Sequence, residues 1–249
     1  MNIDLAGKRA IVAGGSRGIG RAIALAFAEA GAGVSICARG PERLAATREE
    51  IARHGRKAHS AVCDLADAAA IPGYIEDAAA ALGGIDILVN NASGFGASDD
   101  ETGWAVSVSV DLMATVRAIR TALPHLEKSG SGAILNISSI SGLRATPRTP
   151  PYAAVKAAVV NYTLTEASAL ARKGIRVNSI APGSIEFPGG TWERARLNNP
   201  DLYGRILRSI PFGRLGKPEE VAQVALFLCS PLAGWVTGQT IAVDGGQVL

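Results

Sequence analysis

A glycine-rich loop near the start of the chain most restricts the possible fold. Residues 8–13 predict a strand, with an apolar stretch at residues 10–13, and Gly14, Gly18 and Gly20 follow it closely. Residues 21–30 then predict an apolar helix. Glycines in such a loop allow a tight turn and let backbone N–H groups approach a phosphate, which the positive end of the helix dipole favours. A strand, a glycine loop and a helix in this order are typical of the first unit of a nucleotide-binding α/β domain.

Strand and helix patterns alternate along the remaining sequence. Further strands are predicted at residues 33–38, 58–63, 86–90, 133–137, 174–181 and 239–243, and helices at residues 42–54, 68–82, 104–126, 152–173 and 218–229. This alternation predicts an α/β fold with a doubly wound, seven-stranded parallel sheet and a ligand crevice at the carboxyl ends of the strands. With 249 residues and 48% hydrophobic content, residues 1–249 are expected to bury one large core as a single domain.

Charge and cysteine content argue against several other classes of protein. The net charge is only +3 and the basic residues are scattered, so no nucleic-acid surface is predicted. The three cysteines lie far apart, which favours buried thiols in a reduced, cytoplasmic protein, and the three histidines lack metal-ligand spacing, so no metal is predicted. The longest uncharged run, residues 221–243, contains Pro231 and two glycines, so no membrane span is expected. A first strand that begins by about residue 8 leaves no room for a signal peptide.

The candidate chemistry converges on a serine, a tyrosine and a lysine. The apolar strand at residues 133–137 ends just before Ser139 and places it at the crevice. Tyr152 and Lys156 are four residues apart, so they lie one turn apart on the same face of the next helix. A cation this close favours the phenolate form of a tyrosine and helps it to exchange a proton near neutral pH. Taken alone, a tyrosine and a lysine at this spacing more often belong to an ordinary exposed helix face.

Several motifs together resemble the short-chain dehydrogenase/reductase family in its single-domain form, and its 3-oxoacyl reductases in particular. They occur in the family's order: a glycine loop at residues 13–20, with Ala13 in place of a threonine; Asn90-Asn91-Ala92-Ser93; Ser139 thirteen residues before Tyr152, with Lys156 after it; and Pro182-Gly183. The resemblance covers nearly the whole chain. It implies a Rossmann-like sheet and an enzyme that interconverts a ketone and a secondary alcohol by hydride transfer.

The resemblance also implies a role for each residue of the central group. Tyr152 gives its proton to the carbonyl oxygen, Ser139 hydrogen-bonds that oxygen, and Lys156 favours the phenolate and holds the nicotinamide ribose. Asp111 stands where the family usually carries the asparagine of its catalytic tetrad, and we expect its carboxylate to serve the same proton relay. The alternative is that Asp111 points into solvent and matters only for stability.

The implied cofactor is NADP(H). Ala38 stands where an NAD-specific relative carries an acidic residue, so a 2′-phosphate could bind Arg39 and Arg17 without repulsion. The alternative is that both arginines are merely solvated. The residues expected to bind the cofactor are Gly14, Ser16, Arg17, Gly18, Ile19, Gly20, Arg39, Asp64, Leu65, Asn91, Ala92, Tyr152, Lys156, Pro182, Gly183 and Ile185. Asp64 could instead be only a helix N-cap.

The sequence departs from the family pattern at several positions. Ser93 replaces a glycine, and we expect Gly94 and Gly96 to restore the backbone freedom, while Phe187 stands where the family often has a threonine. These departures, with Ala13 and Asp111, motivate a second hypothesis, a cofactor-binding regulator or scaffold with weak catalysis.

Residues 186–216 form the longest segment without a predicted strand and suggest an irregular substrate lid. Its aromatic residues indicate an apolar substrate, although simple packing under the segment explains them equally well. A 3-oxoacyl thioester is the leading small-molecule substrate, ahead of steroid, sugar or xenobiotic carbonyls. The resemblance further implies a homotetramer or homodimer, because small residues on the helix that begins at Tyr152 allow close approach of a second copy.

Overall fold

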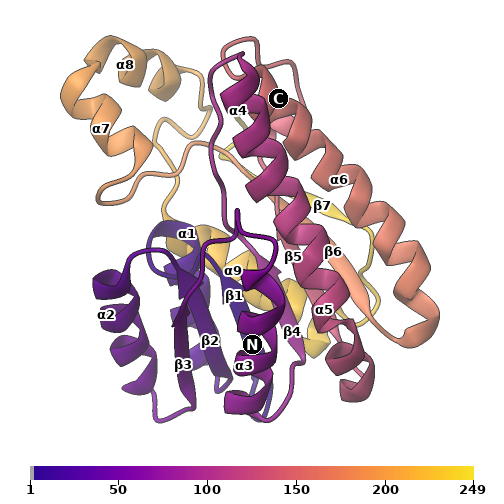
Figure 1. The fold of residues 1–249 in the computed structure, drawn as a ribbon. Helices are drawn as coiled ribbons and strands as arrows, with labels where there is room; N and C mark the ends of the chain where they lie inside the picture. The colour runs from indigo at the N-terminus through magenta and orange to yellow at the C-terminus, as the bar shows by residue number, and fades with distance from the viewer. Residues whose placement is uncertain (1–2) are drawn as a thin grey trace.

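The computed structural model describes residues 3–249, which contain one seven-stranded, fully parallel sheet (Figure 1). The strands are β1 (Arg9–Ala13), β2 (Gly33–Ala38), β3 (Ala58–Val62), β4 (Ile87–Asn90), β5 (Ala133–Ile137), β6 (Arg176–Pro182) and β7 (Thr240–Val243). Their order across the sheet is β3-β2-β1-β4-β5-β6-β7. The chain therefore reverses its direction of winding between β1 and β4, and ligands bind at such a reversal in doubly wound sheets. The predicted fold class is confirmed.

Helices cover both faces of the sheet. Their bounds are α1 (Gly18–Glu29), α2 (Pro41–Ala52), α3 (Ala70–Leu82), α4 (Glu101–Val106), α5 (Ala114–Ser129), α6 (Pro150–Leu170), α7 (Thr191–Asn198), α8 (Pro200–Arg208) and α9 (Pro218–Cys229). Buried side chains of α1, α2 and α9 form one hydrophobic cluster with the strands. Those of α3, α5 and α6 form a second cluster on the opposite face. This three-layer arrangement is the usual result of right-handed strand–helix–strand crossovers.

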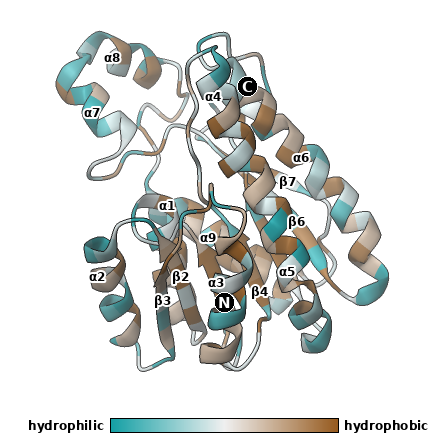
Figure 2. Ribbon diagram, viewed as in Figure 1, coloured by the Kyte–Doolittle hydropathy of each residue, from teal (hydrophilic) through white to brown (hydrophobic). Residues whose placement is uncertain are grey.

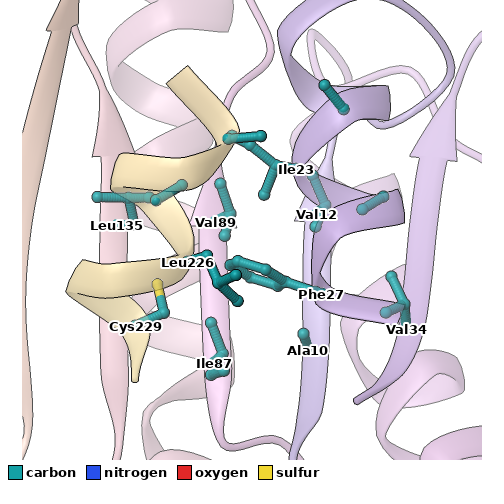
Figure 3. Close-up of a cluster of buried hydrophobic side chains, with 14 of the residues drawn as sticks. Ala10, Val12, Ile23, Phe27, Val34, Ile87, Val89, Leu135, Leu226 and Cys229 are labelled. Atoms are coloured by element: carbon teal, nitrogen blue, oxygen red, sulfur yellow. The ribbon is translucent and has the colours of Figure 1, made fainter. Parts of the chain in front are cut away.

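The first cluster shows how the apolar strands and helices fix the sheet. Phe27 on α1 is fully buried and points toward Leu226 of α9 and the central strands β1 and β4 (Figure 3). Hydrophobic residues concentrate on the central strands, as expected for strands buried on both faces (Figure 2). Burial of a side chain as large as Phe27 contributes about 2–3 kcal/mol to folding. All three cysteines are free and buried, as their sequence setting predicted.

One long helix was predicted at residues 104–126, and this prediction is wrong in one respect. The structure has α4, then a π-helical segment Ser107–Met113, then α5. A π-helical segment inserts extra residues into a helix and changes which side chains face inward, and such segments occur often at functional sites. Here the segment turns the side chain of Asp111 into the interior, where the residue is 1% exposed.

The prediction that residues 186–216 are irregular is also wrong. The helices α7 and α8 occupy much of this segment and project from the body of the protein beside the start of α1 (Figure 1). A single parallel bridge between Ile185 and Gly216 closes the base of the segment. Within it, Glu186 accepts hydrogen bonds from the Arg196 side chain and from the Tyr203 hydroxyl. The segment is therefore a small helical unit with its own polar contacts.

Candidate active site

The glycine loop is built around direct backbone contacts. Gly14 has φ +78°, which glycine adopts more easily than other residues. A Cβ atom on Gly20 would collide with the carbonyl oxygen of Gly14 and with the side chain of Asn91. The amide Nδ2 of Asn91 donates to the same Gly14 carbonyl at 2.9 Å. Asn91, the residue that follows β4, thus fixes the loop after β1 against the first turn of α1.

The end of β5 is followed by Ser138 and by Ser139, the serine predicted at this edge. Ser138 and Ser139 follow the strand and are almost fully buried. The hydroxyl of Ser138 donates to the backbone carbonyl of Lys156 at 2.9 Å, which ties the strand end to α6. The hydroxyl of Ser139 accepts from the backbone N–H of Ser141 at 3.1 Å. That contact uses the oxygen as an acceptor and leaves the Ser139 hydroxyl proton for another partner.

Lys156 lies in a buried polar cluster behind this edge. Its Nζ donates to the backbone carbonyl of Ile137 at 2.9 Å and lies 3.0 Å from Oδ1 of Asp111. The other carboxylate oxygen of Asp111 accepts from the backbone N–H of Gly94 at 2.9 Å. The alternative of a solvent-facing Asp111 is therefore wrong. Asp111 links the lysine to the loop that follows β4.

Tyr152 is half-buried in the first turn of α6, beside the lysine. The Nζ of Lys156 lies 5.6 Å from the centre of the Tyr152 ring. A cation over an aromatic face is attracted by the ring as well as by any charge on its oxygen. The ring of Phe95 packs edge-on against that of Tyr152, with centroids 4.9 Å apart and an interplanar angle of 64°. Phe95 is therefore a neighbour of the candidate acid that the motifs did not identify.

The loop around Ser93 differs from the expectation. Gly94 and Gly96 were expected to provide backbone freedom, but Phe95 itself takes the left-handed conformation, with φ +47°. A Cβ atom on Gly94 would clash with Val106, so this glycine is required by close approach to α4. The Ser93 hydroxyl accepts from the Phe95 N–H at 3.1 Å and supports the turn. The unusual conformation of Phe95 directs its ring at Tyr152.

Exposed cations and one local turn lie at the carboxyl ends of β1, β2 and β3. Arg17 ends the glycine loop, and Arg39 directly follows β2, where Ala38 supplies no carboxylate. Asp64 Oδ1 accepts from the backbone N–H of Ala66 at 3.0 Å, and α3 begins only at Ala70. The alternative of Asp64 as a helix N-cap is therefore wrong. Leu65 is buried and contributes to the second hydrophobic cluster.

Three further predicted cofactor residues lie where β6 ends. Pro182 is the last residue of β6, and the N–H of Gly183 donates to the carbonyl of Val243 on β7 at 3.0 Å. Ile185 is 6% exposed and packs into the first hydrophobic cluster. Phe187 reaches back to the glycine loop, since a Cβ atom on Gly18 would lie only 2.6 Å from its ring.

The remaining predicted cofactor residues line the same loops. Ser16 accepts a hydrogen bond from Thr47 of α2 through its carbonyl oxygen at 3.4 Å, Ile19 packs against the first cluster, and Ala92 against the second. Sequence reasoning missed a buried amide chain beneath the site, in which Asn90 donates to Asn136 at 2.9 Å and Asn136 donates to Thr163 at 3.0 Å. Each of these polar residues lies in an otherwise apolar segment of the sequence, and this pattern could have identified the buried amide chain, because buried polar groups need hydrogen-bond partners.

Comparison with known proteins identifies the family. The sequence model of a family described as Enoyl-(Acyl carrier protein) reductase matches residues 13–247. The 3-oxoacyl-(acyl-carrier-protein) reductase FabG of Aquifex aeolicus is 38% identical over an alignment of 255 positions that covers 99% of this chain and 100% of the relative. This chain belongs to the short-chain dehydrogenase/reductase family. It is an oxidoreductase of that family, and its relatives are dehydrogenases and reductases.

Two solved structures of this short-chain dehydrogenase/reductase family have nearly the same fold. The L-sorbose reductase of Gluconobacter frateurii, complexed with NADPH and L-sorbose, superposes with a TM-score of 0.92 at 32% identity and covers 100% of this chain and 99% of its own. A 7α-hydroxysteroid dehydrogenase complexed with NADH and 7-oxo glycochenodeoxycholic acid also gives a TM-score of 0.92, at 35% identity over 98% and 96% of the two chains. Two relatives that resemble this chain to the same degree thus have different cofactors and different substrates.

Neither a metal-ligand cluster nor a membrane-spanning helix is present among residues 3–249. No three His, Cys, Asp or Glu side chains gather as metal ligands would. No helix in this range is both long and apolar enough to cross a lipid bilayer.

Proposed function

We propose that this short-chain dehydrogenase/reductase interconverts a ketone and a secondary alcohol with NADP(H), using Tyr152 as the general acid and base. The observation that carries the proposal is the buried contact network of Lys156. Its ammonium lies within reach of the Tyr152 ring and is held by Ile137 and Asp111. A desolvated lysine beside a half-exposed tyrosine is an arrangement suited to stabilising a phenolate.

The proposed mechanism assigns one task to each residue. A bound nicotinamide cofactor supplies or accepts the hydride. Tyr152 donates its phenolic proton to the carbonyl oxygen during reduction and removes it during oxidation. Ser139 donates its hydroxyl proton in a hydrogen bond to the same oxygen and orients the substrate. We assign Lys156 the stabilisation of the phenolate and a hydrogen bond to the ribose of a bound cofactor. We assign Asp111 the positioning of Lys156.

The glycine loop and its surroundings fit a dinucleotide. Direct contacts among Gly14, Gly20 and Asn91 leave backbone rather than side chains at the start of α1, which suits a diphosphate. Ala38 and Arg39 favour a 2′-phosphate over a free ribose hydroxyl. Relatives with NADH and with NADPH are both known, so this preference rests on the residues of this chain.

We propose residues 186–216 as the substrate lid and a 3-oxoacyl thioester as the leading substrate. The lid is a helical unit beside the crevice, closed at its base by the Ile185–Gly216 bridge. The likeness to 3-oxoacyl-(acyl-carrier-protein) reductases over the full chain supports the thioester. Steroid and sugar carbonyls are the next candidate substrates, because relatives of similar identity are named as a hydroxysteroid dehydrogenase and an L-sorbose reductase.

One assay tests the reaction and the main alternative. Purified protein is mixed with NADPH or NADH and a panel of 3-oxoacyl thioesters, steroid ketones and ketoses, and cofactor absorbance is followed. We expect turnover with NADPH and at least one thioester. Binding of cofactor without turnover of any carbonyl would favour the weakly catalytic regulator or scaffold.

We further propose a homotetramer in the cytoplasm. Ala154, Ala157 and Leu164 leave an exposed, largely apolar outer face on α6. A second apolar area lies after α9, where Trp235 is fully exposed and Leu232 is half-exposed. A tetramer with three two-fold axes needs two separate interfaces, and these two areas provide candidates. Sedimentation of a monomer at micromolar concentration would contradict the proposed tetramer.

The proposed cytoplasmic location is supported by the three free, buried thiols, which are typical of a reducing compartment.

A further inference from the structure

The beginning of the proposed lid lies directly on the nucleotide-binding end of the body. The ring of Phe187 covers Gly18 in the glycine loop. Two residues later, the position of a Cβ atom on Gly189 is 3.9 Å from both terminal nitrogens of the Arg43 guanidinium on α2. The short segment 187–190 therefore joins the glycine loop to α2 and places the start of α7 beside both.

Four arginines from four different segments meet at this place. Arg17 belongs to the glycine loop, Arg39 follows β2, Arg43 lies on α2 and Arg194 on α7. Nη1 of Arg194 donates to the carbonyl of Gly189 at 3.3 Å, the same glycine that lies beside Arg43. Burial lowers the pKa of Arg17, and the charges of Arg43, Arg194 and Arg39 lower it further. The other three guanidinium groups are thus close enough to repel that of Arg17.

This repulsion has no matching acidic partner. None of the ion pairs formed within residues 3–249 includes any of the four arginines. Glu193 on α7 also contacts Gly189, since its Oε2 accepts from the Gly189 N–H at 2.7 Å, but it forms no ion pair with any of the four arginines. A cluster of like charges costs free energy that a bound anion with two negative charges would relieve. The cluster lies at the carboxyl end of β2, where the proposed cofactor carries its 2′-phosphate.

We propose that Arg194 is a specificity residue for the 2′-phosphate of NADP(H), which it binds together with Arg17, Arg39 and Arg43. This inference rests on the NADP(H) dependence proposed above. Arg194 belongs to the lid, whereas the other three arginines belong to the body. The 2′-phosphate therefore joins the lid to the body, and NADPH orders the lid more strongly than NADH does.

The test compares three arginine variants with the unmodified protein by calorimetric binding of NADPH, NADH and adenosine 2′-monophosphate. Arg194→Ala should weaken NADPH and adenosine 2′-monophosphate about tenfold, the size expected of one charge-assisted hydrogen bond at an exposed site, and leave NADH unchanged. Arg205→Ala is the matched control, because Arg205 is an exposed arginine on α8 of the same lid. We expect no change in any of the three affinities from Arg205→Ala. Arg39→Ala tests the underlying cofactor assignment.

Amide hydrogen exchange of residues 188–208 provides an independent measurement. In the unmodified protein NADPH should slow exchange in this segment more than NADH does, and in Arg194→Ala the two cofactors should protect it equally. Equal weakening of NADPH and NADH by Arg194→Ala would place the arginine on the shared diphosphate and overturn the proposal. The proposal would also be overturned if Arg194→Ala kept the full preference for NADPH over NADH while Arg39→Ala lost that preference. If the unmodified protein itself binds both cofactors equally, the proposed NADP(H) dependence fails instead.

Discussion

The Nζ atom of Lys156 lies 3.0 Å from Oδ1 of Asp111, and both side chains are almost completely removed from solvent. The two residues come from different helical segments, the π-helical turn before α5 and the second turn of α6. Removing one member of a buried ion pair leaves the other charge without compensation, at a cost of about 3–5 kcal/mol. The contact also connects the proposed acid–base group to the loop that carries Phe95.

Asp111→Ala should lower both the free energy of unfolding and kcat, whereas Asp111→Asn should retain activity. An asparagine keeps an oxygen for the Gly94 N–H but removes the negative charge, so it favours tyrosinate at Tyr152. The rise of the alcohol-oxidation rate with pH should therefore move to lower pH in Asp111→Asn. Rates across about pH 6–10, with urea unfolding in parallel, measure both effects. A pH–rate profile in Asp111→Ala that matches the unmodified protein would remove Asp111 from the proposed site.

Tyr152→Phe should reduce turnover at least about a hundredfold, the loss expected for a general acid. Its affinity for NADPH should stay nearly unchanged, because the ring and its packing against Phe95 remain. Steady-state kinetics and cofactor titration separate the two quantities. Tyr162→Phe on the same helix is the control and should keep normal turnover. Substantial activity in Tyr152→Phe would contradict the proposed acid.

Arg39→Ala should weaken NADPH much more than NADH. A hydrogen bond to a charged group contributes about 1.5–3 kcal/mol, which corresponds to a loss of roughly tenfold or more. The ratio of kcat/KM for the two cofactors provides the measurement, and high salt should reduce the difference, since the contact is exposed. An unmodified protein that uses both cofactors equally would contradict the assignment.

Glu220 should make a stability contribution that disappears in acid. Its hydrogen bond from Arg214, with a second from the backbone N–H of Lys217 at the start of α9, lowers its pKa to about 2. A lowered pKa in the folded state gives stability that is present above the ordinary value and is lost as the pH falls toward about 2.

Glu220→Gln should therefore lower the free energy of unfolding at pH 7 by about 1 kcal/mol, a small value because the Arg214 contact is exposed. The difference from the unmodified protein should shrink as the pH falls below about 4.5. Urea unfolding at pH 7 and pH 3.5 measures this difference, with Glu219→Gln, at the preceding residue of the same first turn, as the control. A difference that is independent of pH would show that the carboxylate charge is not responsible.

The sequence by itself determined the order of the seven strands and of the helices that connect them, the glycine loop, and the spacing of Ser139, Tyr152 and Lys156, but not α7 and α8. These features depend on local periodicity and on backbone conformations that glycine adopts with least strain, so a linear pattern reports them. The end of β5 and the first turn of α6 then meet because consecutive parallel strands place their loops at one edge.

Only the tertiary structure decided how side chains from distant segments pair. The π-helical segment turns Asp111 toward Lys156, and a positive φ turns Phe95 toward Tyr152. Neither follows from residue spacing, because both depend on packing between α4, α5 and α6. The same holds for Arg194, which bonds to Gly189 beside Arg43 only because residues 186–216 fold back over the start of α2. Contacts between segments far apart in sequence depend on how the whole domain packs, so the local pattern of residues does not predict them.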